Sequence, residues 1–447
     1  MLKARALQTK IKHQILEEYI AAWGGIIVNG AAHHAASAQQ RGAAFEVHLI
    51  YVDANAFAGR YDGEQEEEIA GRIPTTVYGS PIIGIQALDK IAAWAETRGV
   101  KVRTNTILVE IDPHTFGELR TSLLMAGFAA RVKMTDKFST LRDGEIAMVN
   151  ADCLAAMPAI VRYTQGGRAF SLYFLDPYGP KALPGNYVAE VIAKPRHDVI
   201  INMPYQDLHK KTGLARKEGR TAAEEQVLNN YDRMFLDPGW RDIGRRLDRD
   251  DIWDELAGVP VLRNAGSVEL ELVDRYRSTL QAIDETLAVK AIGLQFSDHE
   301  RTMFYLYLTT HDADGALAIN KILMAANLEE HELRWKLWQT KQEQAHQTTM
   351  MFDTTAFAPP PAQPKRLEPK DIAEKLYALL KGQRLTRKQV NSALADTPYF
   401  SGEITRALTQ LRQDGRAVYD TPMNNGTSIF FPLVPSATSA STARRGR

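Results

Sequence analysis

The sequence predicts an α/β protein built on a doubly wound, Rossmann-like parallel sheet, with a helical insertion and a C-terminal winged helix-turn-helix. Two observations carry this prediction. Short apolar runs typical of buried strands recur between residues 45 and 309, and helical patterns separate most of them. Buried strands that alternate with helices form parallel sheets, because parallel strands need a crossover connection.

The elements of this sheet follow in order along the chain. The apolar spacing over 7–23 predicts an amphipathic helix, and the small-residue stretch Ala31–Ala36 is expected to be a loop. Strands are expected at 45–52, 106–109, 146–149, 169–175, 198–202 and 303–309. Helices are expected at 82–95, 116–125, 187–192 and 315–326. The polar interval of about 205–265 breaks the alternation, so we expect a largely helical cap near the carboxyl edge of the sheet.

The remainder of the chain divides into a linker and a small domain. Residues 339–368 are rich in Gln, Thr, Ala and Pro, a composition typical of a semi-rigid linker. Within 369–434, three helical patterns, a capping box at Thr386–Gln389 and the turn sequence Asn424-Asn425-Gly426 predict three helices and a hairpin. This is the outline of a winged helix-turn-helix. Residues 435–447 are expected to be a disordered tail.

Composition and charge narrow the function classes. The chain has 447 residues, no net charge and 45% hydrophobic residues, which is ordinary for a globular protein. Residues 361–447 carry 14 Lys/Arg against 7 Asp/Glu, so nucleic-acid contact is expected at this end. The single cysteine excludes an intramolecular disulfide or a cysteine-built zinc site. No apolar run approaches membrane-spanning length and no signal-peptide core is present, so we expect a cytoplasmic protein without membrane contact. No metal is expected, because His33-His34 has no carboxylate at ligand spacing and His311–Asp314 is typical of a turn and N-cap.

Acidic residues follow the ends of several predicted strands. Asp53 ends the first strand, Glu110 the second, Asp152 the third, and the Asp176–Gly179 tetrad follows the fourth. Ligands of doubly wound sheets bind at the carboxyl ends of the strands. Glu110 is placed to accept hydrogen bonds from a ribose diol, and Asp152 lies within reach of an adenine edge. Together these residues predict a nucleoside pocket, although each one alone is a weak signal.

These and further motifs resemble the three-Cys-motif partner family, whose main domain is similar to class I S-adenosylmethionine-dependent methyltransferases. The matching segments cover roughly residues 10–335. They are Tyr51-Val52-Asp53, Phe57-Ala58-Gly59, Gly79-Ser80-Pro81, Val109-Glu110-Ile111-Asp112, Phe174-Leu175-Asp176-Pro177-Tyr178-Gly179 and Tyr305-Leu306-Tyr307-Leu308-Thr309-Thr310-His311.

The resemblance implies that 1–338 is a methyltransferase-like domain that binds S-adenosylmethionine. The cofactor-binding residues that it implies are Asp53, Phe57, Ala58, Gly59, Ser80, Glu110 and Asp152. The family name implies a separately encoded cysteine-motif partner protein. The chain departs from the family pattern in its first loop, where Ala54–Ala56 intervene and Arg60-Tyr61 replace Pro-Gly.

Asp176-Pro177-Tyr178 resembles the Asp-Pro-Pro-Tyr motif of methyltransferases that modify exocyclic amines of nucleic-acid bases. Such an amine is a poor nucleophile because its lone pair is delocalised into the ring. A carboxylate and a backbone carbonyl that accept its two N–H bonds stabilise the charge that develops as it attacks a sulfonium methyl group. Tyr178 would stack on an extruded or unpaired base. The alternative is that 176–179 is only a turn that ends a strand.

Basic residues of the C-terminal unit are candidates for nucleic-acid contacts. Arg406 and Arg412 lie on the expected recognition helix, and Arg384, Arg387 and Lys388 cluster around the start of the second helix. Winged helices also serve as protein-docking modules, and basic helix faces are usually just solvated.

The leading hypothesis is therefore a methyltransferase that modifies a base amine of DNA or RNA, presented to it by the winged helix. Asp176, Pro177 and Tyr178 are the expected catalytic residues. The main alternative is a non-catalytic methyltransferase-fold scaffold or partner protein that binds nucleic acid through the winged helix. A transcriptional regulator with a small-molecule sensor domain is a third possibility.

Overall fold

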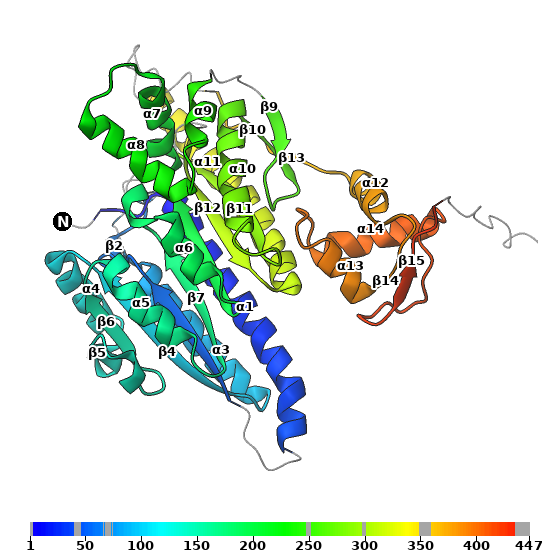
Figure 1. The fold of residues 1–447 in the computed structure, drawn as a ribbon, viewed down its shortest axis with the longest axis horizontal. Helices are drawn as coiled ribbons and strands as arrows, with labels where there is room; N and C mark the ends of the chain where they lie inside the picture. The colour runs from blue at the N-terminus through cyan, green and yellow to red at the C-terminus, as the bar shows by residue number, and fades with distance from the viewer. Residues whose placement is uncertain are drawn as a thin grey trace, which may run out of the picture.

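The computed structural model describes residues 3–39, 46–65, 67, 73, 75–246, 252–296, 301–347 and 359–433. It confirms a mixed α/β architecture with a large, mostly parallel central sheet of Rossmann-like type (Figure 1). None of the helices in these ranges has the length and apolar character needed to cross a membrane.

The central sheet has eight strands in the order β11-β12-β8-β7-β1-β4-β6-β5. Their bounds are β1 (Glu46–Asp53), β4 (Lys101–Glu110), β5 (Val132–Met134), β6 (Ile146–Asn150), β7 (Ala169–Leu175), β8 (His197–Met203), β11 (Ala288–Gln295) and β12 (Thr302–Thr310). In this sheet order, the six strands from β8 to β5 (β8, β7, β1, β4, β6 and β5) are parallel. Strand β12 pairs antiparallel with both β8 and β11. All six expected strands are present, and β5 and β11 were not foreseen. The chain adds β4 and β6 on one side of β1 and then β7 and β8 on the other, so the topological switch point lies at β1 and β7.

Helices pack along this sheet. They are α1 (Leu7–Gln39), α3 (Ser80–Thr97), α4 (Pro113–Met125), α5 (Cys153–Thr164), α6 (Gly185–Ile192), α10 (Ser267–Gln281) and α11 (Ala313–Gln347). Helix α1 packs against α3 and α11, while α5 and α6 contact β7 and β8 respectively. The loop expected at Ala31–Ala36 is wrong, because α1 continues to Gln39. Alanine has the highest helix propensity, so a small-residue stretch that follows a helix extends it.

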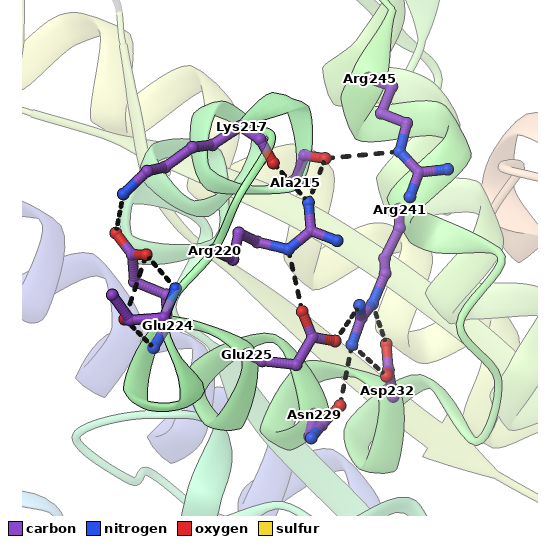
Figure 2. A network of polar contacts seen from close by, with 10 residues as sticks. Ala215, Lys217, Arg220, Glu224, Glu225, Asn229, Asp232, Arg241 and Arg245 are labelled. Carbon is purple, nitrogen blue, oxygen red and sulfur yellow. Dashed lines mark hydrogen bonds and ion pairs between the residues drawn. The ribbon is translucent and has the colours of Figure 1, made fainter.

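The expected insertion forms a cap of three helices and a hairpin. Its elements are α7 (Tyr205–Arg216), α8 (Ala222–Phe235), α9 (Trp240–Arg245), β9 (Ile252–Glu255) and β10 (Val261–Ala265). Figure 2 shows the polar network that joins the three helices. The Arg241 guanidinium bonds Glu225, Asn229 and Asp232, and Arg220 bonds Glu225 as well as two main-chain carbonyls. Several bonds per guanidinium hold the α7–α8 turn in one arrangement.

The C-terminal unit has a hydrophobic core of its own. It contains α12 (Pro369–Leu380), β14 (Arg384–Thr386), α13 (Arg387–Ala393), α14 (Ser401–Gln413) and β15 (Ser428–Phe430). Strand β14 pairs with β15, and a single antiparallel bridge joins Val418 to Phe430 where the hairpin was expected. The capping box at Thr386 is present at the start of α13.

The segment between the two units differs from the expected linker. Helix α11 continues nine residues beyond position 338, and Lys365–Arg366 form strand β13, which pairs with β10. Residues 348–358 of the expected linker and the expected tail 435–447 lie outside the described residues.

The turn between α13 and α14 docks on β11 and α11. Lys290 Nζ donates to the Thr397 carbonyl at 2.9 Å, and Asn320 Nδ2 donates to the Thr397 and Tyr399 carbonyls at 2.8 and 2.7 Å. Leu317 of α11 belongs to the apolar core of the C-terminal unit. The unit therefore packs beside the amino ends of the parallel strands, since α11 follows the end of the antiparallel strand β12.

Candidate functional site

A cavity of about 1010 Å³ lies at the carboxyl edge of the sheet. Three of the predicted strand-end residues, Glu110, Asp152 and Asp176, line it together with Phe57, Pro177 and Tyr178. The first two come from the ends of β4 and β6 and the third from the end of β7, so the strand order brings together residues that are up to 66 positions apart in the chain. The volume lies at the upper end of the range for small-molecule sites.

Asp176 makes two strong contacts in the wall of this cavity. Lys12 Nζ of α1 lies 2.5 Å from its Oδ2, and the Asn202 amide of β8 donates to its Oδ1 at 2.5 Å. The Lys12 ammonium also lies over the Phe174 and Phe304 rings, at 5.9 and 5.3 Å from their centroids. The charge on Asp176 is therefore neutralised by a buried cation that is itself stabilised by two aromatic faces.

Glu110 is almost buried and organises two loops. Its Oε2 accepts from the Phe57 backbone N–H at 3.0 Å, and its Oε1 accepts from the Asp112 backbone N–H at 2.9 Å. A carboxylate has about four acceptor positions, so each oxygen keeps one for a ligand. The bond to Phe57 holds that residue at φ 51°, in the left-handed region that costs a non-glycine residue about 1–2 kcal/mol.

Asp152 is exposed and serves as the N-cap of α5, where its Oδ1 accepts from the Leu154 backbone N–H at 2.8 Å. Its second oxygen is unconstrained by any hydrogen bond to the described residues. The neighbouring Cys153 is buried against Asn55, as expected for a small apolar residue, and burial raises the pKa of its thiol. The thiol is therefore a poor nucleophile.

Asp53 lies beneath the cavity and does not line it. The residue is fully buried, accepts from the Tyr51 hydroxyl at 3.1 Å and from the Asn55 backbone N–H at 3.3 Å, and shares a hydrogen bond with the Ser80 side chain. Burial raises the pKa of the Asp53 carboxyl to about 7, and the nearby charge of Asp176 adds to the rise. Asp53 and Ser80 therefore support the floor of the cavity.

Ala58 and Gly59 also face away from the cavity. Ala58 is buried and its carbonyl accepts from the Ser122 hydroxyl of α4 at 2.6 Å. Gly59 has φ 70°, and a Cβ there would lie 2.9 Å from Leu119 Cδ1, so both its conformation and its packing favour glycine. Among the predicted cofactor-binding residues, those that line the cavity are Phe57, Glu110 and Asp152, and those that do not line it are Asp53, Ala58, Gly59 and Ser80.

Two exposed aromatic rings stand at the cavity. Tyr178 is 86% exposed and Phe57 is 40% exposed, and their ring centroids lie 5.9 Å apart in an edge-to-face arrangement. Arg60 of β2 (Arg60–Asp62) turns away to bond Glu118 at 2.8 Å, whereas Tyr61 forms part of the cavity wall. The altered loop therefore contributes one ring to the cavity wall, and the cavity remains open.

Of the five basic candidates in the C-terminal unit, four are exposed and one, Arg387, is buried. Arg387 is buried and its guanidinium donates to the Ser401 carbonyl and the Thr405 hydroxyl. Arg384, Arg406 and Arg412 each lie over an aromatic ring of the same unit, and Lys388 is exposed.

Sequence reasoning missed several residues of the cavity wall. Asn202 stands at the carboxyl end of a predicted strand, so the rule that ligands bind at strand ends could have identified it. Lys12 lies among the apolar positions of α1, where periodicity alone gives no reason to expect a functional cation. Lys181 and Lys211 line the cavity from η3 (Pro180–Ala182) and α7.

Comparisons with known proteins add little to this site. No protein-family model matches the chain, and no curated protein matches it. Among solved structures, it is similar to the crystal structure of protein LPL1258 from Legionella pneumophila str. Philadelphia 1, described with the family model DUF519. The two chains share 11% sequence identity over 69% of this chain and 86% of the other, with a TM-score of 0.34. A likeness of this degree carries no argument about function.

Proposed function

We propose that this chain is an S-adenosylmethionine-dependent methyltransferase-like protein that modifies an exocyclic amine of a nucleic-acid base and works with a cysteine-motif partner protein. One observation carries the proposal. Glu110, Asp152 and the 176–178 segment, predicted separately from three strand ends, border one cavity beside the switch point of the sheet.

The residues on the Glu110 side of the cavity suit a nucleoside cofactor. Glu110 presents a fixed carboxylate with acceptor capacity for a ribose diol, and Asp152 presents a free oxygen toward an adenine edge. Asn55 and Phe57 complete this wall in place of the shorter loop of the family. S-adenosylmethionine would supply an activated methyl group here.

The residues on the opposite side suit the amine. Asp176 and the Pro177 carbonyl would accept hydrogen bonds from the two N–H groups of the amine, and Tyr178 would stack on the base. Lys12 and Asn202 hold the Asp176 carboxylate in one position before the amine binds. A hydrogen-bond acceptor that is already in place need not reorganise during the reaction.

Isothermal titration with S-adenosylmethionine tests the cofactor half, and transfer of a labelled methyl group to DNA or RNA tests the reaction. We expect Glu110→Gln to weaken cofactor binding and Asp176→Ala to abolish transfer while leaving cofactor binding intact. Asp420→Ala, an exposed carboxylate in the C-terminal unit, is the matched control. Absence of binding and transfer in the wild type, with Asp176→Ala indistinguishable from it, would refute the enzyme.

The alternative function is a non-catalytic scaffold, and the Asp176 contacts favour it. Each carboxylate oxygen already has one partner, and the Lys12 ammonium balances the charge that would otherwise attract the amine. A pull-down with a cysteine-motif protein beside a gel shift on nucleic acid separates the two functions. A stable partner complex without methyl transfer favours the scaffold.

A further inference from the structure

We propose that the nucleic acid is a single, unpaired strand held by the cap at the mouth of the cavity, and not a duplex presented by the C-terminal unit. This inference rests on the proposed function for the identity of the reaction, but the strand-binding surface is argued from charge, exposure and topology alone. We define the strand-binding surface as Lys3, Tyr178, Lys181, Lys210 and Lys211.

The first argument is the distribution of lysines around the cavity. Lys3, Lys12, Lys181 and Lys211 line it, facing the acidic residues Glu110, Asp152, Asp176 and Asp207. Lys12 pairs with Asp176, and Lys211 lies 3.6 Å from Asp207. Lys3 and Lys181 are exposed and form no ion pair with the described residues. The lining as a whole has equal numbers of lysines and carboxylates, but its exposed charges are Lys3 and Lys181 against Asp152 alone.

The second argument is that this charge continues onto the cap. Lys210 is exposed next to Lys211 on α7, and a groove of about 690 Å³ at the α7–α8 turn is lined by Arg216, Lys217, Arg220 and Arg245. Arg216 donates only to main-chain carbonyls, those of Gly244 and Arg246, at 2.9 and 2.7 Å. A carbonyl fixes the guanidinium without cancelling its charge. The other three cations of the groove form ion pairs, Arg220 with Glu225, Lys217 with Glu224 and Arg245 with Asp242, so the positive charge that the groove adds is that of Arg216.

The third argument is the pair of aromatic rings at the cavity. Tyr178 and Phe57 are exposed beside this basic rim, and exposed rings in a positively charged groove are the usual platform for single strands. Base stacking on such a ring is independent of sequence, and an unpaired base reaches Asp176 without the energy needed to open a duplex.

The fourth argument is the position of the C-terminal unit. It docks through Thr397 and Tyr399 beside the amino ends of the parallel strands. The cavity lies at the other edge, where Phe304 at the start of β12 forms part of its wall. The seven residues from Phe304 to Thr310 alone span about 20 Å at the usual rise of a strand. In this arrangement, a base on α14 does not reach Asp176. Figure 1 shows α7 and α8 of the cap apart from the C-terminal unit, which contacts the cap through the ion pair between Lys375 of α12 and Glu255 of β9.

Fluorescence anisotropy of labelled single strands and of the matching duplex, with the full-length chain and no S-adenosylmethionine, tests this surface. We expect tighter binding of the single strand. Lys181→Gln/Lys210→Gln/Lys211→Gln should weaken it at least about tenfold and lower the slope of log K against log salt by about 2, at about 0.7 per phosphate contact. Tyr178→Ala should weaken it by about fivefold or more, as expected for the loss of one stacked base.

Two triple variants serve as comparisons. Lys90→Gln/Lys101→Gln/Lys336→Gln removes the same charge from exposed positions that do not line the cavity. It should bind within about twofold of the wild type, because charges beyond the screening length of about 10 Å from the strand contribute little. Arg384→Gln/Arg406→Gln/Arg412→Gln removes the rival surface and should behave in the same way.

The outcomes separate this inference from the proposed function. Loss of binding in the arginine variant but not in the cap variant, equal affinity for the duplex, or no strand binding at all would overturn the strand-binding surface. A free mononucleotide that binds as tightly as the strand would overturn it too. Strand binding by the cap without methyl transfer would leave the surface standing and refute the enzyme.

Discussion

The contact between Lys12 and Asp176 supports a quantitative prediction. Lys12→Met keeps much of the apolar packing against Phe174 and Phe304 but removes the ammonium that neutralises the carboxylate. Removing one partner of a fully buried ion pair costs about 3–5 kcal/mol. Because the Asp176 side chain is 21% exposed and keeps its bond to Asn202, we expect a smaller loss, about 2–3 kcal/mol.

A double-mutant cycle measures this interaction. Asp176→Asn leaves the more deeply buried Lys12 unpaired and should also destabilise, whereas Lys12→Met/Asp176→Asn removes both charges. The double variant should therefore recover at least about 1 kcal/mol relative to the sum of the single losses.

Urea unfolding followed by tryptophan fluorescence is a suitable assay. All six tryptophans lie between positions 23 and 338, so the signal follows the α/β domain and not the C-terminal unit. Single losses that simply add, with a coupling below about 0.5 kcal/mol, would refute the interaction as described.

Three further predictions concern the surroundings of the site. Gly84→Ala would place a Cβ 2.2 Å from the Tyr51 ring, so the domain should lose about 1–3 kcal/mol in the same urea assay. Because burial raises the pKa of Asp53 to about 7, the folded protein keeps a proton that the unfolded chain releases near pH 4, so the free energy of unfolding should fall by up to about 4 kcal/mol as the pH rises from about 4 to 7. Asp53→Asn should reduce this dependence of the free energy of unfolding on pH. Lys290→Met removes the bond to the Thr397 carbonyl and should loosen the C-terminal unit, seen as faster limited proteolysis between the two units.

Each of these predictions has a contrary result. Gly117→Ala, in an exposed helical position with open space around its Cβ, should stabilise by about 0.5–1 kcal/mol, and an equal loss at both glycines would contradict the packing argument. If Asp53→Asn leaves the pH dependence of unfolding unchanged, Asp53 is not its source. Asp198 would then be the next candidate, since burial also raises the pKa of that residue to about 7. Unchanged proteolysis in Lys290→Met would mean that Asn320 and the apolar contacts suffice for docking.

Much of the fold was predictable because its signals are local. The six expected strands and the capping box at Thr386 are present, since apolar runs and cap spacing report on neighbouring residues. The errors arose where local signals were weak. Helix α1 continues through the alanines at 31–36, and α11 continues past 338 into a segment whose polar composition suggested a linker.

The sequence by itself determined that acidic residues stand at the carboxyl ends of successive parallel strands, because strand period and strand ends are short-range properties. Only the tertiary structure decided which of them reach a common cavity. Asp53 is held below it by Tyr51 and Ser80, whereas Asp176 lies in its wall, paired with a lysine 164 positions away. The charge state and direction of a side chain depend on which distant groups pack against it, and no spacing along the chain encodes that contact.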